Sequence, residues 1–106
     1  MTILLDALAA VDSQDANLME KLLHEEFLFV DDYNMKTTDE WLVTIRELFK
    51  EKSLDFTNKR RIVADTRDLW AMEYEREIDG KIMKITNVSL LKDGKFWRSF
   101  IHRVPV

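Results

Sequence analysis

The 106 residues suit one domain with one core, and 46% hydrophobic and 34% charged residues are typical of a globular protein. Sixteen basic against twenty acidic residues leave a net charge of −4, which disfavours nonspecific binding to nucleic acid. No apolar run approaches the roughly 20 residues that a membrane-spanning helix needs.

The sequence also indicates the cellular compartment and excludes some covalent chemistry. It contains no cysteine, which excludes disulfides and thiol nucleophiles. The first six residues, MTILLD, have no basic region before their apolar residues and so do not resemble a secretory signal. We therefore expect a cytoplasmic protein that does not engage membranes.

Two short helices are predicted at the N-terminus. Residues 3–11 are almost wholly apolar and favour a buried helix. The polar stretch 12–15 offers N-cap side chains for a second helix, which is expected to run to about His24 with Leu18 and Leu22 on its apolar stripe.

A strand and a third helix are predicted next. Residues 27–30, FLFV, break the helical spacing and indicate a buried strand that ends at Asp31 and Asp32. Thr37 and Glu40 form a capping box, in which Glu40 reaches back to the amide of the cap residue. The amphipathic helix that follows carries the apolar residues Trp41, Leu42, Ile45, Leu48 and Phe49.

The second half of the chain predicts a sheet. A strand over 55–66 leads through a polar turn at 65–68 into a three-strand antiparallel meander over 69–104. Both glycines of the chain lie in Asp-Gly pairs, at 79–80 and 93–94. Such pairs suit two-residue turns, because both central residues need a positive φ. The predicted order is α-α-β-α-β-β-β-β.

Apolar residues are expected on both faces of the last strands. The strand that begins at 69 alternates cleanly, with Trp70, Met72 and Tyr74 on one face and glutamates on the other. The next two strands carry large apolar residues on both faces. We expect the outer face to pack on a second copy in a homodimer. A curled sheet that buries both faces within one chain is the alternative.

This order of elements, with the closing segment DGKFWRSFIHRV over 93–104, resembles the nuclear transport factor 2-like superfamily, and its SnoaL-like branch most of all. The resemblance covers nearly all of 1–106, taken as a single domain. It implies an α+β fold, a cystatin-like roll in which a curved antiparallel sheet forms a cone packed against three N-terminal helices, usually as a dimer. The family includes ketosteroid isomerase, polyketide cyclases, dehydratases and noncatalytic binders, so the fold does not select the function.

Asp31 and Asp32 are the candidate proton-transfer groups. They follow a buried strand, so one should point into the core, where a carboxylate can act as a general base. The resemblance to ketosteroid isomerase places the catalytic base on Asp32. It places the two oxyanion-hole positions on Ala7, which has no hydroxyl, and near Asn87, which can donate a hydrogen bond. Alternatively, both aspartates are solvated residues at a strand end.

The two histidines are predicted to have different roles. His102 lies in the last strand, where several SnoaL-like proteins place an acid or base, and it could pair with Asp32 across the pocket. Alternation in that strand groups His102 with Phe96 and Phe100. The competing interpretation is a surface histidine. His24 is expected at a helix end, where the dipole favours a cation.

A pocket for a small apolar ligand is predicted from the aromatic residues, each of which could instead be plain core. The candidates are Tyr33, Trp41, Trp70, Tyr74 and Trp97, with Asn87 as a polar contact. No metal-ligand spacing or Gly-rich phosphate loop is present, so no metal or cofactor is predicted.

Two functions remain open from the sequence. One is a small-molecule pocket, such as that of a lyase or isomerase, in which Asp32 moves a proton. The other is a noncatalytic module whose sheet mediates dimerisation or partner binding. A cavity in front of the carboxylate would favour the first.

Overall fold

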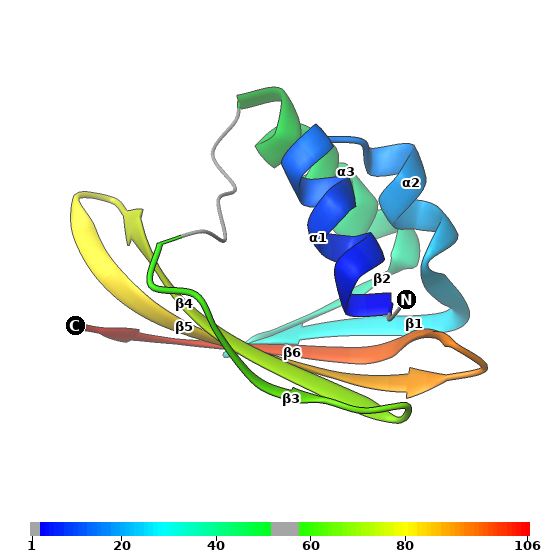
Figure 1. Ribbon diagram of the computed structural model, residues 1–106. Helices are drawn as coiled ribbons and strands as arrows, with labels where there is room; N and C mark the ends of the chain where they lie inside the picture. Colours follow the sequence, from blue (N-terminus) through cyan, green and yellow to red (C-terminus); the bar gives the residue numbers. More distant parts are fainter. Residues whose placement is uncertain (1–2, 52–57) are drawn as a thin grey trace.

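The computed structural model describes residues 3–51 and 58–106, which form three helices and six strands (Figure 1). The helices are α1 Ile3–Ser13, α2 Ala16–Lys21 and α3 Thr38–Glu51. The strands are β1 Leu23–Asp31, β2 Asn34–Thr37, β3 Arg61–Asp65, β4 Leu69–Ile78, β5 Lys81–Lys92 and β6 Lys95–Pro105. None of these helices is long and apolar enough to cross a membrane.

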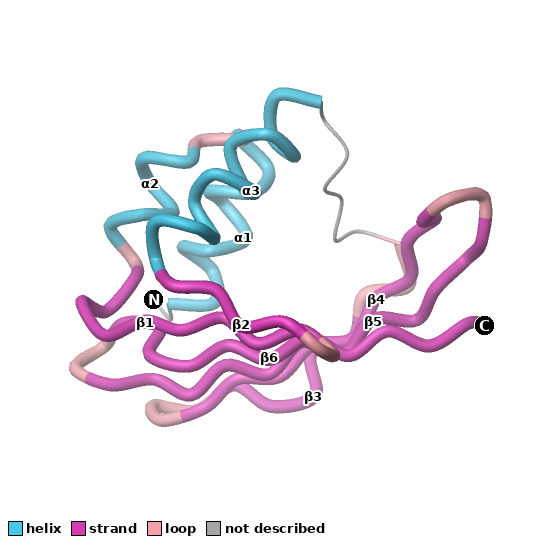
Figure 2. The backbone as a smooth tube through the Cα atoms, turned by 180° about the vertical axis from the view of Figure 1, so that it is seen from behind, coloured by secondary structure: helices cyan, strands magenta, loops and turns pink. Residues whose placement is uncertain are grey.

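The strands form one curved sheet in the order β2-β1-β6-β5-β4-β3. The three helices lie together on its inner face, while the far end of the β4–β5 hairpin rises on the same side (Figures 1 and 2). The predicted α+β architecture is confirmed. One detail differs, because β1 pairs with β6 in parallel and only the other four pairings are antiparallel.

The two Asp-Gly pairs form the predicted hairpin turns. Asp79 and Gly80 have φ values of 51° and 79°, and Asp93 and Gly94 have 54° and 74°. The residues on either side pair in register, Ile78 with Lys81 and Lys92 with Lys95. All four turn residues are left-handed, as a type I′ turn requires. Local chemistry therefore sets the register of each hairpin next to its turn.

Helix starts also follow local chemistry. The Asp15 carboxylate accepts a hydrogen bond from the Leu18 amide at 3.1 Å and caps α2. At α3, Glu40 Oε1 accepts from the Thr37 amide at 3.0 Å and from its hydroxyl at 2.9 Å. This reach back to the cap amide is the predicted one.

Element boundaries differ from the prediction in three places. The second helix ends at Lys21, and His24 is a buried residue of β1 instead of a helix-end cation. The short strand β2 was not predicted. The strand expected over 55–66 is observed as Arg61–Asp65, and residues 55–57 lie outside the described part of the chain.

A bulge at Trp97 reverses the expected faces of β6. Leu90 pairs with Arg98 and Leu91 with Phe96, so Trp97 has no opposite partner. Phe96 therefore shares the inner face with Ser99 instead of with Phe100. The grouping of His102 with Phe96 is wrong for the same reason, since simple alternation holds only within an unbroken strand.

The core lies between the helices and the inner face of the sheet. Its largest fully buried side chains are Tyr74, Met72 and Ile85 from β4 and β5. α1 and α3 close it from above with Leu4, Ala10, Leu42, Ile45 and Phe49.

The outer face of the sheet carries an apolar row across all six strands. Register pairs join Met35 to Val30, Val30 to Phe100, Phe100 to Val88, Val88 to Ala71 and Ala71 to Ala64. We call these six residues the outer row. No described helix covers them (Figure 1).

Candidate functional site

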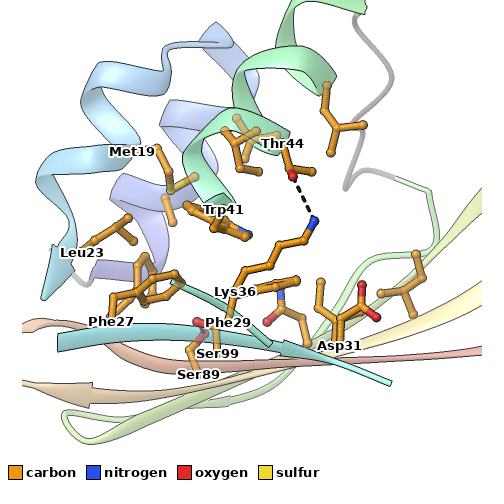
Figure 3. Close-up of a pocket in the computed structure, with 18 of the residues that line it drawn as sticks. Met19, Leu23, Phe27, Phe29, Asp31, Lys36, Trp41, Thr44, Ser89 and Ser99 are labelled. Carbon is orange, nitrogen blue, oxygen red and sulfur yellow. Dashed lines mark hydrogen bonds between the residues drawn. The ribbon is translucent and has the colours of Figure 1, made fainter. Parts of the chain in front are cut away.

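A cavity of about 120 Å³ lies between the helices and the inner face of the sheet. Residues from all three helices and from every strand except β3 line it (Figure 3). Its deep part is apolar. Trp41 packs there against Phe27 and Phe29, with ring centroids 5.2 and 5.8 Å apart, and Trp70 meets Phe96 edge-on at 5.5 Å.

Four charged side chains among the described residues belong to the lining of the cavity. They are those of Asp31, Lys36, Arg76 and Arg103. Asp31 Oδ2 lies 3.1 Å from Arg103 Nη1, and both side chains are mostly buried. Lys36 Nζ donates to Thr44 Oγ1 on α3 at 2.9 Å, across the space between β2 and the helix (Figure 3).

Several buried polar atoms of the lining lack partners. Trp70 Nε1, Arg76 Nε and Asn87 Oδ1 are buried and have no hydrogen-bond partner among residues 3–51 and 58–106. Ser89 and Ser99, in contrast, satisfy each other through hydroxyls 2.7 Å apart. Unpaired buried donors and acceptors are costly, so these three atoms are available to a molecule that enters the cavity.

Tyr74 brings a neutral phenol to the lining. Burial raises its pKa to about 12, and the Arg76 and Arg103 guanidiniums lower it only in part. The phenol therefore stays protonated at physiological pH.

Asp32 and His102 lie outside the cavity lining. Asp31 follows Phe27 and Phe29 at two-residue steps and points inward, whereas Asp32 stands in the next turn with φ of 30°. The expected pairing forms, with His102 Nδ1 3.2 Å from Asp32 Oδ1, but His102 is on the outer side and its side chain is 69% exposed. Because neither residue lines the cavity, their catalytic role stays a prediction.

The other predicted ligand residues divide into two groups. Trp41, Trp70, Tyr74 and Asn87 line the cavity, as does Ala7. Tyr33 is 99% exposed in the turn before β2. Trp97 stands on the bulge, where its Nε1 donates to Glu26 at 3.2 Å and Arg98 stacks 4.0 Å from its ring centroid.

Sequence reasoning misses the three cations of the site. Arg76 could have been found, because the alternation that turns Trp70 and Tyr74 inward turns Arg76 inward as well. Arg103 is concealed by the bulge, and Lys36 belongs to the unpredicted β2. Within residues 3–51 and 58–106, no three histidine, aspartate or glutamate side chains are grouped to hold a metal ion.

Solved structures similar to this chain share one fold. An NTF2-like protein of unknown function from Cytophaga hutchinsonii has a TM-score of 0.70 at 13% identity, covering 95% of this chain and 86% of its own. A steroid delta-isomerase from Pseudomonas aeruginosa has a TM-score of 0.72 at 10% identity, covering 97% and 77%.

A third similar structure is IdmH of Streptomyces antibioticus, described as a candidate polyketide cyclase, with a TM-score of 0.67 at 17% identity and coverages of 94% and 88%. No protein-family model matches this sequence, and neither does any curated protein. At these identities the structures establish the nuclear transport factor 2-like fold of the chain, and the fold alone.

Proposed function

We propose that this protein binds a small organic molecule in the cavity beneath the helices. The observation that carries the proposal is the combination of an apolar floor with unpaired buried polar atoms, Trp70 Nε1, Arg76 Nε and Asn87 Oδ1, in one lining. An apolar pocket with a few convergent polar groups is the usual form of a ligand site. The shared fold with a steroid isomerase and a candidate polyketide cyclase is consistent with it.

The cavity volume limits the size of the ligand. A cavity of about 150 Å³ accommodates benzene, so the smaller volume of about 120 Å³ here limits the body of the ligand to at most one small ring or a short aliphatic chain. The aromatic walls made by Trp41, Phe27 and Phe29 favour a flat body. A steroid or a fused polyketide is too large for this volume.

Tryptophan resonances offer a direct test of binding. The chain has three tryptophans, of which Trp41 and Trp70 line the cavity and Trp97 does not. Titration with single-ring aromatic compounds should shift the indole N–H signals of Trp41 and Trp70 and leave that of Trp97 in place. Equal shifts of all three signals, or none, would contradict binding in the cavity.

A matched pair of variants checks the location. Ala7 lines the cavity, while Ala9 is exposed on the same helix. Ala7→Leu should fill part of the space and weaken binding at least tenfold, whereas Ala9→Leu should leave it unchanged. Thermal unfolding of both variants shows whether Ala7→Leu remains folded.

A second proposed role is proton transfer by Asp31, in place of Asp32. Asp31 is the only carboxylate among the cavity-lining residues that the structure describes. Its oxygen would take a proton from a ligand carbon next to a carbonyl group and return it to that carbon or a neighbouring one, as in an isomerase. The neutral Tyr74 phenol stands in the same lining as a hydrogen-bond donor for the enolate oxygen.

Hydrogen–deuterium exchange tests the chemical step apart from binding. A bound carbonyl compound should exchange its α-hydrogens with D₂O faster than in free solution. Asp31→Asn should lower that rate by about 10²–10⁴-fold and still shift Trp41 and Trp70 on binding. Asp32→Asn is the control and should exchange at the wild-type rate. Full exchange in Asp31→Asn would rule out this role.

A further inference from the structure

The lining of the cavity is positively charged, although the chain as a whole is negatively charged. The chain carries a net −4, yet the described lining holds three cations, Lys36, Arg76 and Arg103, and the single carboxylate of Asp31. The phenol of Tyr74 is neutral, because burial raises its pKa to about 12. The lining therefore carries two positive charges more than negative ones.

Of these three cations, only Arg103 has an acidic partner in the part of the chain that the structure describes. Arg103 pairs with Asp31 at 3.1 Å and approaches Asp32 at 3.6 Å. Lys36 has a hydroxyl, Thr44, as its hydrogen-bond acceptor at 2.9 Å. Among the described residues Arg76 has no acidic partner, and its Nε is buried without an acceptor.

Lys36 and Arg76, which have no acidic partner among the described residues, line the same cavity. Lys36 reaches across the cavity from β2 to α3, as Figure 3 shows, and Arg76 lines it from β4 beside Tyr74. A half-buried cation loses part of its hydration free energy, and a bound anion compensates for this loss. A planar guanidinium suits the two oxygens of a carboxylate in particular.

We infer that the ligand is a small carboxylic acid, with its acid group bound by a cation of the lining that has no acidic partner, Lys36 or Arg76, and a one-ring or short aliphatic body against Trp41 and Phe29. This inference rests on the proposed binding function and specifies its substrate class. A carboxylate fits better than a phosphate, because the acid group and the body of the ligand share about 120 Å³ and a flat carboxylate is smaller than a tetrahedral phosphate.

Three probes of one shape and different charge test the inference. Phenylacetate, phenylacetamide and phenethylamine are titrated at pH 7 while the indole signals of Trp41 and Trp70 are followed. Phenylacetate should bind at least tenfold more tightly than phenylacetamide, and phenethylamine should not bind measurably. Phenyl phosphate is a fourth probe, and tighter binding than phenylacetate would overturn the choice of a carboxylate.

Variants locate the acid group. At least one of Arg76→Gln and Lys36→Met should weaken phenylacetate at least tenfold and change phenylacetamide less than twofold. Lys81→Gln removes the same charge from the exposed β4–β5 turn and should change neither. If Lys81→Gln weakens phenylacetate as much as that variant does, the effect is that of net charge and the assigned anchor is wrong.

The outcomes separate this inference from the proposed function. Equal affinity for phenylacetate and phenylacetamide would overturn the acid preference and leave small-molecule binding intact. If no probe shifts Trp41 or Trp70, binding in the cavity fails, and the inference fails with it.

Discussion

Asp31 and Asp32 show how one step along the chain separates two chemical settings. Asp31 lies in the cavity lining, whereas Asp32 contacts His102 on the outer side. Arg103 Nη1 lies 3.1 Å from the Asp31 carboxylate and 3.6 Å from that of Asp32. Four charged or ionisable groups thus connect the cavity to the outer face. A carbonyl compound in the cavity could meet Asp31 and Arg103, which line it, but not Asp32 or His102, which do not.

The buried phenol of Tyr74 makes stability depend on pH in the alkaline range. Its pKa is about 12 in the folded chain against about 10 when unfolded. Below pH 10 both states keep the proton, so the full stability is present. Between pH 10 and 12 only the unfolded state loses it, and stability falls by about 2–3 kcal/mol as pH rises.

Urea unfolding at pH 9 and pH 12 measures this fall. Tyr74→Phe should remove about 2–3 kcal/mol of the pH dependence, whatever its offset at pH 9. In a Tyr33→Phe variant Tyr74 is the only tyrosine, so absorbance at 295 nm should show one ionisation near pH 12. A midpoint near pH 10 would mean that the phenol is not buried as described.

At the scale of elements, local chemistry predicts the turns and caps but not the faces. The Asp-Gly pairs and the Thr37–Glu40 box work within four residues, and each forms as the sequence indicates. The bulge at Trp97 is not indicated by the sequence, because it depends on packing between β6 and its neighbours. That single irregularity hides Arg103 and misplaces His102. Trp41, Trp70 and Tyr74 of the cavity were predicted from the sequence, whereas Arg103 and Lys36 were not predictable.

The β5–β6 turn should be sensitive to its glycine. Gly94 has a φ of 74°, and a Cβ added there would meet nothing within 4 Å, so only the backbone would be strained. Gly94→Ala should lower the free energy of unfolding by about 1–2 kcal/mol in a urea titration. Gly94→Asn should cost less, because asparagine tolerates this conformation. An alanine variant as stable as the asparagine one would contradict the turn geometry.

At the scale of the whole molecule, the outer face has the properties of an interface. The outer row spans six strands, about 24 Å at the usual strand spacing. The charged groups beside it are already paired, as Glu73 is with Arg61 and Lys84, and Asp32 is with His102. A partner could therefore cover this face without burying an isolated charge. We propose that the partner is a second copy of this chain, related by a two-fold axis.

Light scattering after size exclusion tests the dimer. Wild type should have twice the 12.6 kDa chain mass. Phe100 lies at the middle of the outer row, so Phe100→Glu would bury an unpaired carboxylate and should weaken association at least about 100-fold, or roughly 2.7 kcal/mol. Val43→Glu adds the same charge on the exposed side of α3, where Val43 is 57% exposed, and should remain dimeric.

The ligand readout separates loss of association from loss of the fold. Phe100 is on the outer face, so a monomeric Phe100→Glu chain should still shift Trp41 and Trp70 when phenylacetate binds. A wild-type protein that stays monomeric would mean that the outer row does not join two copies. A Phe100→Glu variant that stays dimeric would place the contact between copies elsewhere on the chain.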